Sequence, residues 1–180
     1  MEVVARVSLD FARFVEDGTS SLLGTAYLLT RDRQAAEELV QDTLVALYPQ
    51  WPKVAEAQSP IAYVRRALIN RYLNQQRRAS VAERISELLP ERQAAPDFAT
   101  RVDDRDQLRR ALASLPPRQR AAVVLRYFHD LSDQQVADEL GCRATTVRSL
   151  ISRALGTLRA AGRVTDDPTH RRTDQQGDLR

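Results

Sequence analysis

Residues 132–155 read SDQQVADELGCRATTVRSLISRAL and combine a helix start, a turn and a second helix. Ser132 followed three residues later by Gln135 is a capping box, in which each side chain accepts from the other residue's backbone N–H. Gly141 stands where a helix end favours a left-handed residue. Apolar residues resume at helical spacing from Val147. The stretch therefore predicts two helices joined by a tight turn, which is a helix-turn-helix motif.

The second of these helices carries a polar face with arginines and short hydroxyls and no acid. In a helix-turn-helix motif this helix enters the DNA major groove, where arginine reads guanine and hydroxyls contact bases or phosphates. A solvated face on an ordinary helical hairpin is the alternative. The capping box, the turn glycine and the acid-free face together favour DNA binding. The predicted DNA contacts are Arg143, Thr145, Thr146, Arg148, Ser149, Ser152 and Arg153.

The composition of the 180-residue chain indicates a helical, soluble protein. It holds only six glycines, and its formal net charge is +3, with every basic residue except Lys53 an arginine. The one cysteine excludes an internal disulfide and a cysteine-based zinc cluster. We expect no catalytic residues, metal site or cofactor, because no nucleophile–base pair, metal cluster or phosphate-binding glycine loop is present. We expect no membrane insertion and a cytoplasmic location, because the chain has no long apolar run and no signal peptide.

The N-terminal part predicts a bundle of short helices. We expect a first apolar face around residues 11–15 that ends near Gly18, a second helix over 22–29, and a third from the N-cap Asp32 to about Tyr48. On the exposed side of the third helix, acidic and amide side chains surround Val45, which suggests a protein-docking surface. A plain solvated surface is the alternative.

A fourth helix begins at Ser59-Pro60, where serine serves as N-cap and proline as first helical residue. Between residues 61 and 78 the chain has no acid. A polar, basic and partly aromatic stripe on the exposed side suits nucleic-acid backbone and unstacked bases, although such faces are often only solvated. The stripe consists of Tyr63, Arg66, Asn70, Asn74 and Arg77.

The predicted fold class is all-α, with two small helical domains joined by a flexible linker. The first domain spans residues 1–78, the linker 79–103, and the second domain 104–161, followed by a disordered tail over 162–180. Because an extended linker of this length could span about two turns of DNA, the arrangement predicts one protein that reads two separated DNA elements.

Four stretches resemble bacterial sigma factors of the extracytoplasmic-function (ECF) type, in the SigE-like actinobacterial group. They are TAYLLTRDRQAAEELVQDTLVALY, SPIAYVRRALINRYLNQQRR, ASLPPRQRAAVVLRYFHDLSDQQVADELGC and TTVRSLISRALGTLR. They appear in the order of that family and cover most of residues 10–160. By this resemblance the first domain is sigma region 2, a helical bundle, and the second is sigma region 4, which carries the helix-turn-helix.

The resemblance implies a transcription initiation factor that binds core RNA polymerase and recognises promoter DNA. Region 4 would read the −35 element and meet the polymerase flap, and the stripe on the fourth helix would recognise the −10 element and help open it. An anti-sigma factor is a further expected partner. The alternative is a stand-alone helix-turn-helix regulator, which would need a dimer surface or ligand pocket in the first domain. The residues expected to contact the coiled coil of the largest polymerase subunit are Glu38, Leu39, Gln41, Asp42 and Val45.

For three residues outside the predicted binding faces, the sequence favours a structural role over a functional one. Trp51, in the loop before the fourth helix, is predicted to be a hydrophobic plug rather than a base-stacking residue. His129 is predicted to lie in a loop near a helix end and not to bind a ligand. Cys142 is predicted to be a half-buried turn residue rather than a redox switch.

Overall fold

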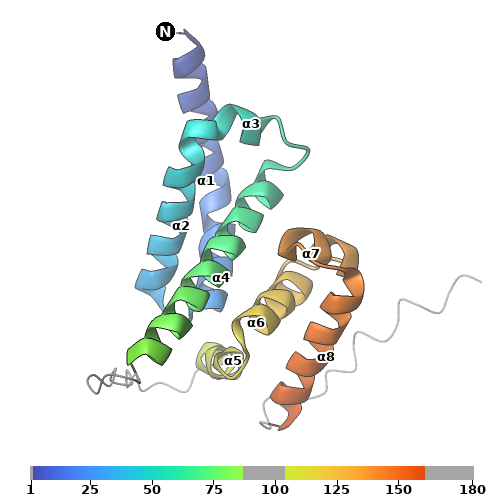
Figure 1. Ribbon diagram of the computed structural model, residues 1–180. Helices are drawn as coiled ribbons and strands as arrows, with labels where there is room; N and C mark the ends of the chain where they lie inside the picture. The colour runs from blue at the N-terminus through green and yellow to red at the C-terminus, as the bar shows by residue number, and fades with distance from the viewer. Residues whose placement is uncertain (1, 87–103, 161–180) are drawn as a thin grey trace, which may run out of the picture.

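The computed structural model describes residues 2–86 and 104–160, with the side chains of residues 10–82 and most of those from Leu108 onward. Helices form all of the regular structure in these two ranges, which confirms the all-α prediction. Helices α1 to α4 form an N-terminal half, and α5 to α8 form a C-terminal half. Figure 1 shows α6 and α7 beside α4, and α8 on the far side of α6.

Helix α1, Glu2–Thr30, is continuous, so the predicted break near Gly18 is wrong. A glycine inside a helix costs about 1 kcal/mol, which is too little to interrupt a helix that packs along its length. The backbone at Gly18 lies close to Phe14 and Ile61: a Cβ built there would stand 3.4 Å from each side chain. A side chain at this position would therefore be in van der Waals contact with α4.

Helix α2, Arg33–Leu47, reverses direction after α1. Arg31 adopts a left-handed φ of 66°, and the Asp32 carboxylate accepts a hydrogen bond from the Ala35 N–H at 2.7 Å. This confirms Asp32 as the N-cap. A 3₁₀ turn, η1 (Tyr48–Gln50), and the short helix α3 (Trp51–Ala55) follow.

Trp51 lies in the core of the N-terminal half, with 2% of its surface exposed. Its ring contacts those of Phe11 and Phe14, with centroid separations of 4.9 Å and 4.8 Å. Edge and tilted aromatic contacts of this kind add to the free energy of burial. The prediction of a hydrophobic plug is confirmed.

Helix α4 spans Pro60–Ser86 and so continues through the first residues of the predicted linker. Residues 79–86 contain no glycine or proline, and an existing helix extends at low cost once its first turns are packed. Because these residues show no sustained apolar stripe, the sequence indicates only a possible short helix around residues 82–89 and not a continuation of α4. The rest of the predicted linker and the predicted tail fall outside the described residues.

The C-terminal half begins with α5 (Asp104–Ala113) and α6 (Pro117–Val123), which continues into a π-helical turn, η2 (Val124–Phe128). Helices α7 (Asp133–Leu140) and α8 (Ala144–Ala160) follow. The capping box is present, and Gly141 has a left-handed φ of 60°. The predicted helix-turn-helix geometry is therefore confirmed.

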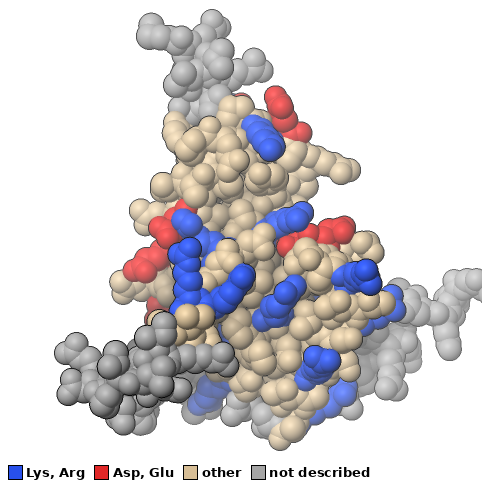
Figure 2. Space-filling view, in the orientation of Figure 1, with Lys and Arg blue, Asp and Glu red and all other residues tan. Residues whose placement is uncertain are grey.

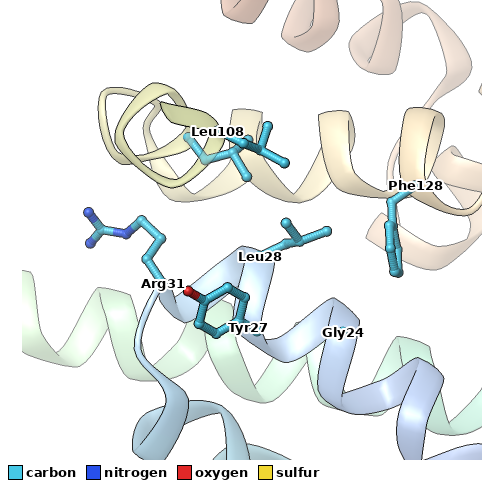
Figure 3. A pocket seen from close by; sticks show the side chains of 7 residues that line it. Gly24, Tyr27, Leu28, Arg31, Leu108 and Phe128 are labelled. Carbon is cyan, nitrogen blue, oxygen red and sulfur yellow. The ribbon is translucent and has the colours of Figure 1, made fainter. Parts of the chain in front are cut away.

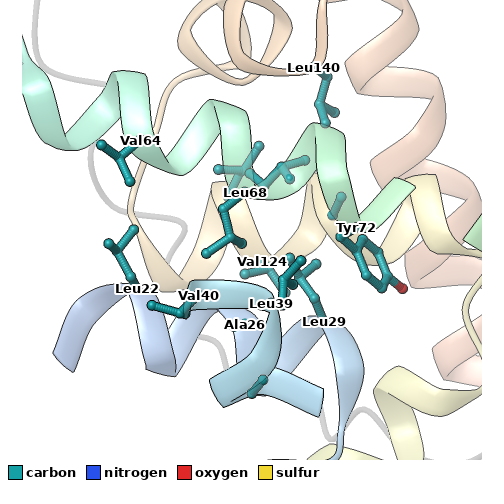
Figure 4. Packing of buried hydrophobic residues seen from close by; sticks show 14 of the residues in the cluster. Leu22, Ala26, Leu29, Leu39, Val40, Val64, Leu68, Tyr72, Val124 and Leu140 are labelled. Carbon is teal, nitrogen blue, oxygen red and sulfur yellow. The ribbon is translucent and has the colours of Figure 1, made fainter. Parts of the chain in front are cut away.

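The two halves share one hydrophobic core. Residues of α1 and α4 pack with residues of α6, η2 and α7 in one continuous buried cluster, as Figure 4 shows for Leu68, Val124 and Leu140. The sequence predicts two separate modules joined by a tether. The helices of each half have apolar stripes that could form a core of their own. The sequence does not show that the stripes of one half also pack against those of the other.

Candidate nucleic-acid interface

Helix α8 is held against the rest of the C-terminal half by its buried side. Val147, Ala154 and Leu158 are buried there, so the opposite side faces solvent. Arg143, in the turn before α8, is also exposed. The predicted residues of α8 that the structure leaves exposed are Thr145, Thr146, Arg148, Ser149, Ser152 and Arg153.

The exposed face of α8 has two sides with different neighbours. One side forms a depression of about 320 Å³ lined by Thr145, Thr146, Ser149, Leu150 and Arg153. The other side carries Arg148 and Ser152, in a second depression of about 300 Å³.

The second depression adds residues that the sequence analysis did not include among the DNA contacts. They are Arg126 in the middle of the π-helical turn and Asp133 at the start of α7. Arg159, near the end of α8 and beside the predicted DNA-facing stripe, also lines this depression. No local signal marks Arg126 or Asp133, because they reach this site only through the packing of three elements.

The stripe on α4 is mostly exposed. Arg66, Asn70, Asn74 and Arg77 face solvent, and Arg77 donates a hydrogen bond of 2.8 Å to the Asn74 side-chain oxygen. Tyr63 is only half-exposed and packs against the core cluster, so its ring is less free than the other four side chains. Figure 2 shows basic residues gathered over the lower part of α4 and along α8 on one face of the molecule.

The exposed face of α2 borders an apolar groove. Val45 keeps 65% of its surface exposed, and Glu38, Gln41 and Asp42 are also exposed. Leu39 is 1% exposed and belongs to the core, so the prediction that it contacts a partner directly does not fit this structure. Groove residues from α1, α2 and η1 enclose about 490 Å³: Phe11, Val15, Thr19, Leu23, Glu37, Val40, Gln41, Leu44, Val45 and Tyr48.

A buried polar cluster joins α4 to the C-terminal half. Arg65 donates from Nε to both Glu139 carboxylate oxygens at 2.9 Å, and its Nη2 also contacts that carboxylate. Beside the pair, His129 lies 3.3 Å from Arg65 Nη1 and 2.7 Å from the Thr25 hydroxyl. Burial, and to a smaller extent the charge of Arg65, lowers the pKa of His129 to about 4. The ring is therefore neutral at pH 7, and its placement near a helix end agrees with the sequence analysis.

Arg120 forms a second polar junction. Its side chain is buried and donates hydrogen bonds to the carbonyl oxygens of Leu112 (2.8 Å) and Leu115 (2.9 Å) in the C-terminal half. It also donates to the Leu29 carbonyl oxygen and the Tyr72 hydroxyl of the N-terminal half, each at 2.8 Å. Burial raises the pKa of Tyr72 and lowers that of Arg120, and their mutual contact opposes both shifts.

Neither Glu139 nor Arg120 was predicted from the sequence to have a role. Glu139 stands next to the buried residues Val136 and Leu140, and Arg120 precedes the buried Ala121. A charged residue within a buried apolar stripe could have indicated a buried polar contact. It does not identify the residue that would be its partner in the other half.

An apolar cavity of about 440 Å³ lies where the halves meet. Figure 3 shows Tyr27 and Leu28 of α1 facing Leu108 of α5 and Phe128 of η2 across it, with Arg31 at the edge. Both Leu108 and Phe128 keep 51% of their surface exposed. The interface is therefore incompletely filled on this side.

No three His, Cys, Asp or Glu side chains in residues 2–86 and 104–160 are grouped so that they could hold a metal ion. Among the helices that the structure describes, none has the length and apolar character needed to cross a membrane.

Two family models match the chain: Sigma-70 region 2 over residues 14–81 and Sigma-70 region 4 over residues 105–158. The RNA polymerase sigma-E factor of Streptomyces avermitilis is 35% identical over 151 residues, covering 84% of each chain. That of Streptomyces coelicolor is 34% identical over 151 residues, covering 84% of this chain and 85% of its own. The solved structure of the sigma factor RpoE in complex with the anti-sigma factor NepR, from Bartonella quintana, matches with a TM-score of 0.69 and 26% identity, covering 87% of this chain and 99% of that one.

Proposed function

Because the chain belongs to the sigma-70 family of RNA polymerase sigma factors, in the ECF group, we propose that it directs core polymerase to promoters with separate −35 and −10 elements. The observation that carries this proposal is the presence of two exposed basic faces in one chain, on α4 and α8, to which these helices themselves contribute no acid between residues 61 and 78 or between residues 144 and 160. Sigma factors are initiation factors, so catalysis belongs to the polymerase. The protein would act with the polymerase in the cytoplasm.

The C-terminal half, assigned to residues 104–161, would read the −35 element. Helix α8 would enter the major groove with Arg148 and Arg153 near base edges, while Arg143 and the hydroxyl residues would contact bases or phosphates. The assignment is supported by the exposure of all these side chains and by the capped helix-turn-helix that presents them.

The N-terminal half, assigned to residues 1–78, would recognise the −10 element and help open it. Arg66 and Arg77 would contact the backbone, and Asn70 and Asn74 would hydrogen-bond unstacked bases. Tyr63 would contribute only through the exposed part of its ring. The support is the row of four exposed polar side chains on one rigid helix.

The exposed face of α2 would dock on core polymerase. An apolar groove beside the exposed Val45 suits a helix of the coiled coil in the largest subunit, with Glu38, Gln41 and Asp42 forming a polar border. Leu39 would support this face from the core. The C-terminal half would meet the polymerase flap.

The packed halves would have to separate before both promoter elements are bound. Elements about two helical turns apart, at roughly 34 Å per turn, lie too far apart for two faces fixed on one small core. Opening would break the Arg65–Glu139 pair and expose the shared core. RpoE was solved with an anti-sigma factor, and we propose that such a partner also binds this chain.

Promoter-specific run-off transcription with core RNA polymerase and a promoter library tests this function. We expect specific transcripts that depend on the added chain, and we expect Arg148→Ala to abolish dependence on the −35 element while core binding is retained. The absence of both specific transcripts and core association would contradict the proposal. DNA binding without core association would instead support a stand-alone regulator.

A further inference from the structure

Asp133 stands between two guanidinium groups at the edge of α8. As the first residue of α7, it accepts a hydrogen bond from Arg148 Nε to Oδ2 at 3.2 Å. Its other oxygen, Oδ1, lies 3.8 Å from Arg126 Nε. The carboxylate therefore connects the exposed arginine of α8 to a neighbouring element of the fold.

The second arginine beside Asp133, Arg126, is itself held by one backbone contact. Arg126 donates from Nη1 to the Leu131 carbonyl oxygen at 2.8 Å. The side chain of Asp133 is 32% exposed, whereas that of Arg148 is 68% exposed. A free arginine side chain loses considerable rotamer entropy when it binds. Here the contact with Asp133 restrains Arg148 before any DNA arrives.

We propose that Asp133 is a positioning residue that sets the base specificity of Arg148. This inference rests on the proposed function, in which Arg148 meets base edges of the −35 element. Because Nε is occupied by Asp133, the two terminal NH₂ groups of Arg148 remain for a bidentate contact. Guanine offers O6 and N7 to such a pair in the major groove. The carboxylate thus orients the arginine for guanine.

The same carboxylate weakens binding to DNA of any sequence. Three arginines, Arg126, Arg148 and Arg159, line this depression, and without an acid they would attract backbone phosphates. Asp133 supplies a negative charge among them and holds Arg148 away from nearby phosphates. It therefore has opposite effects on the two kinds of binding, which distinguishes positioning from simple structural support.

The test is a binding selection with holoenzyme assembled from the full chain and core RNA polymerase. The probe is a pool of double-stranded promoter fragments randomised over the −35 element. For Asp133→Asn we expect guanine enrichment at the Arg148-dependent position to fall about five- to tenfold, part of the discrimination that a bidentate contact supplies. Affinity for promoter-free duplex should rise, with a steeper salt dependence.

Asp138→Asn is the matched control. Asp138 lies on the same helix, is exposed and accepts a hydrogen bond from Gln134 at 3.1 Å, on α7 itself. This variant removes the same charge, so it should raise affinity for promoter-free duplex while guanine enrichment stays within twofold of the wild type. In an Arg148→Lys background, Asp133→Asn should cause no further loss of enrichment.

The outcomes separate the inference from the function on which it rests. If Arg148→Ala leaves base enrichment unchanged, the assignment of Arg148 to base reading is wrong. If Arg148→Ala removes enrichment but Asp133→Asn preserves it, only the positioning role is overturned. Equal losses of enrichment in Asp133→Asn and Asp138→Asn would also overturn it, because the effect would then be one of charge alone.

Discussion

Arg65 on α4 and Glu139 on α7 form a buried ion pair between the two halves, with Arg65 Nε 2.9 Å from each carboxylate oxygen. The two side chains are 10% and 9% exposed. A buried pair adds little net free energy, because both charges lose their hydration, but removal of one partner leaves the other charge uncompensated. The pair therefore adds little free energy to the observed packing of the halves, but any other packing that leaves one of the two charges buried and unpaired is strongly destabilised.

Glu139→Gln should destabilise the packed arrangement by about 3 kcal/mol, because Arg65 would keep its charge without a partner. Separation of the halves would return Arg65 to water, so we expect a larger radius of gyration in small-angle X-ray scattering. Amide exchange in α7 should also be faster. Glu38→Gln, at an exposed acid on α2, is the control and should change neither measurement.

Replacement of both partners, as Arg65→Met with Glu139→Leu, should restore a compact molecule because no buried charge remains. Scattering curves of the double variant should match those of the wild type. A double variant as expanded as Glu139→Gln would show that the ion pair is required for the packed arrangement itself.

The packed form should lose stability as the pH falls from about 6.5 to 4. The pKa of His129 is lowered to about 4 by burial first and Arg65 second, whereas an unfolded histidine titrates near 6.5. In this window the unfolded chain binds the extra proton, so stability is complete above it and declines as the pH decreases. The Thr25 hydroxyl and the Arg65–Glu139 pair face the ring.

Thermal melting of the wild type and His129→Gln at pH 7.5 and pH 5.0 measures this contribution. The wild type should lose about 1 kcal/mol more than the variant on acidification, a value reduced for partial exposure. Glutamine cannot titrate but can still hydrogen-bond Thr25. Identical pH dependence in the two proteins would show that His129 is not the titrating group.

Arg120→Met should be among the most destabilising single changes, with a loss above about 3 kcal/mol. It removes the donors for carbonyl oxygens of Leu29, Leu112 and Leu115, and these acceptors lie in buried surroundings. Tyr72→Phe removes one hydrogen bond to Arg120 and should cost about 1 kcal/mol. Denaturant unfolding followed by the fluorescence of Trp51, the one tryptophan of the chain, compares the two. Equal losses would contradict the central role of Arg120.

Val45→Asp should weaken association with core polymerase at least tenfold without lowering thermal stability. Val45 is 65% exposed beside the apolar groove, so a charge there disrupts an interface rather than the fold. Val81→Asp is the matched control, because Val81 is also an exposed valine, on α4 and outside the groove. Pull-down with core polymerase checks both variants, and equal loss would argue against the groove as the docking site.

The sequence predicted the parts of the structure that depend on local chemistry. The Ser132–Gln135 capping box, the left-handed Gly141 and the buried Trp51 each follow from residue type and spacing. The exposure of Val45 on α2 was likewise visible as an apolar residue on a polar face.

Features that depend on partners distant in sequence were missed. Arg65 and Glu139 are 74 positions apart, and neither residue indicates the other. Asp133 likewise reaches Arg148 only because the tight turn folds α8 back beside the start of α7. Leu39 was assigned to the docking face through the family resemblance, although its own helical position faces the core.

The hydrogen bonds of Arg120 also limit how freely the halves can be recombined. One guanidinium satisfies carbonyl groups from both halves, so a chimera that joins this C-terminal half to an unrelated N-terminal half would leave buried donors and acceptors mismatched. A chimera that uses this C-terminal half to change which −35 element is recognised would therefore also need Tyr72 and the end of α1 from this protein. In this protein the half that reads the upstream element also carries the residue that holds the two halves together, so one cannot be exchanged without affecting the other.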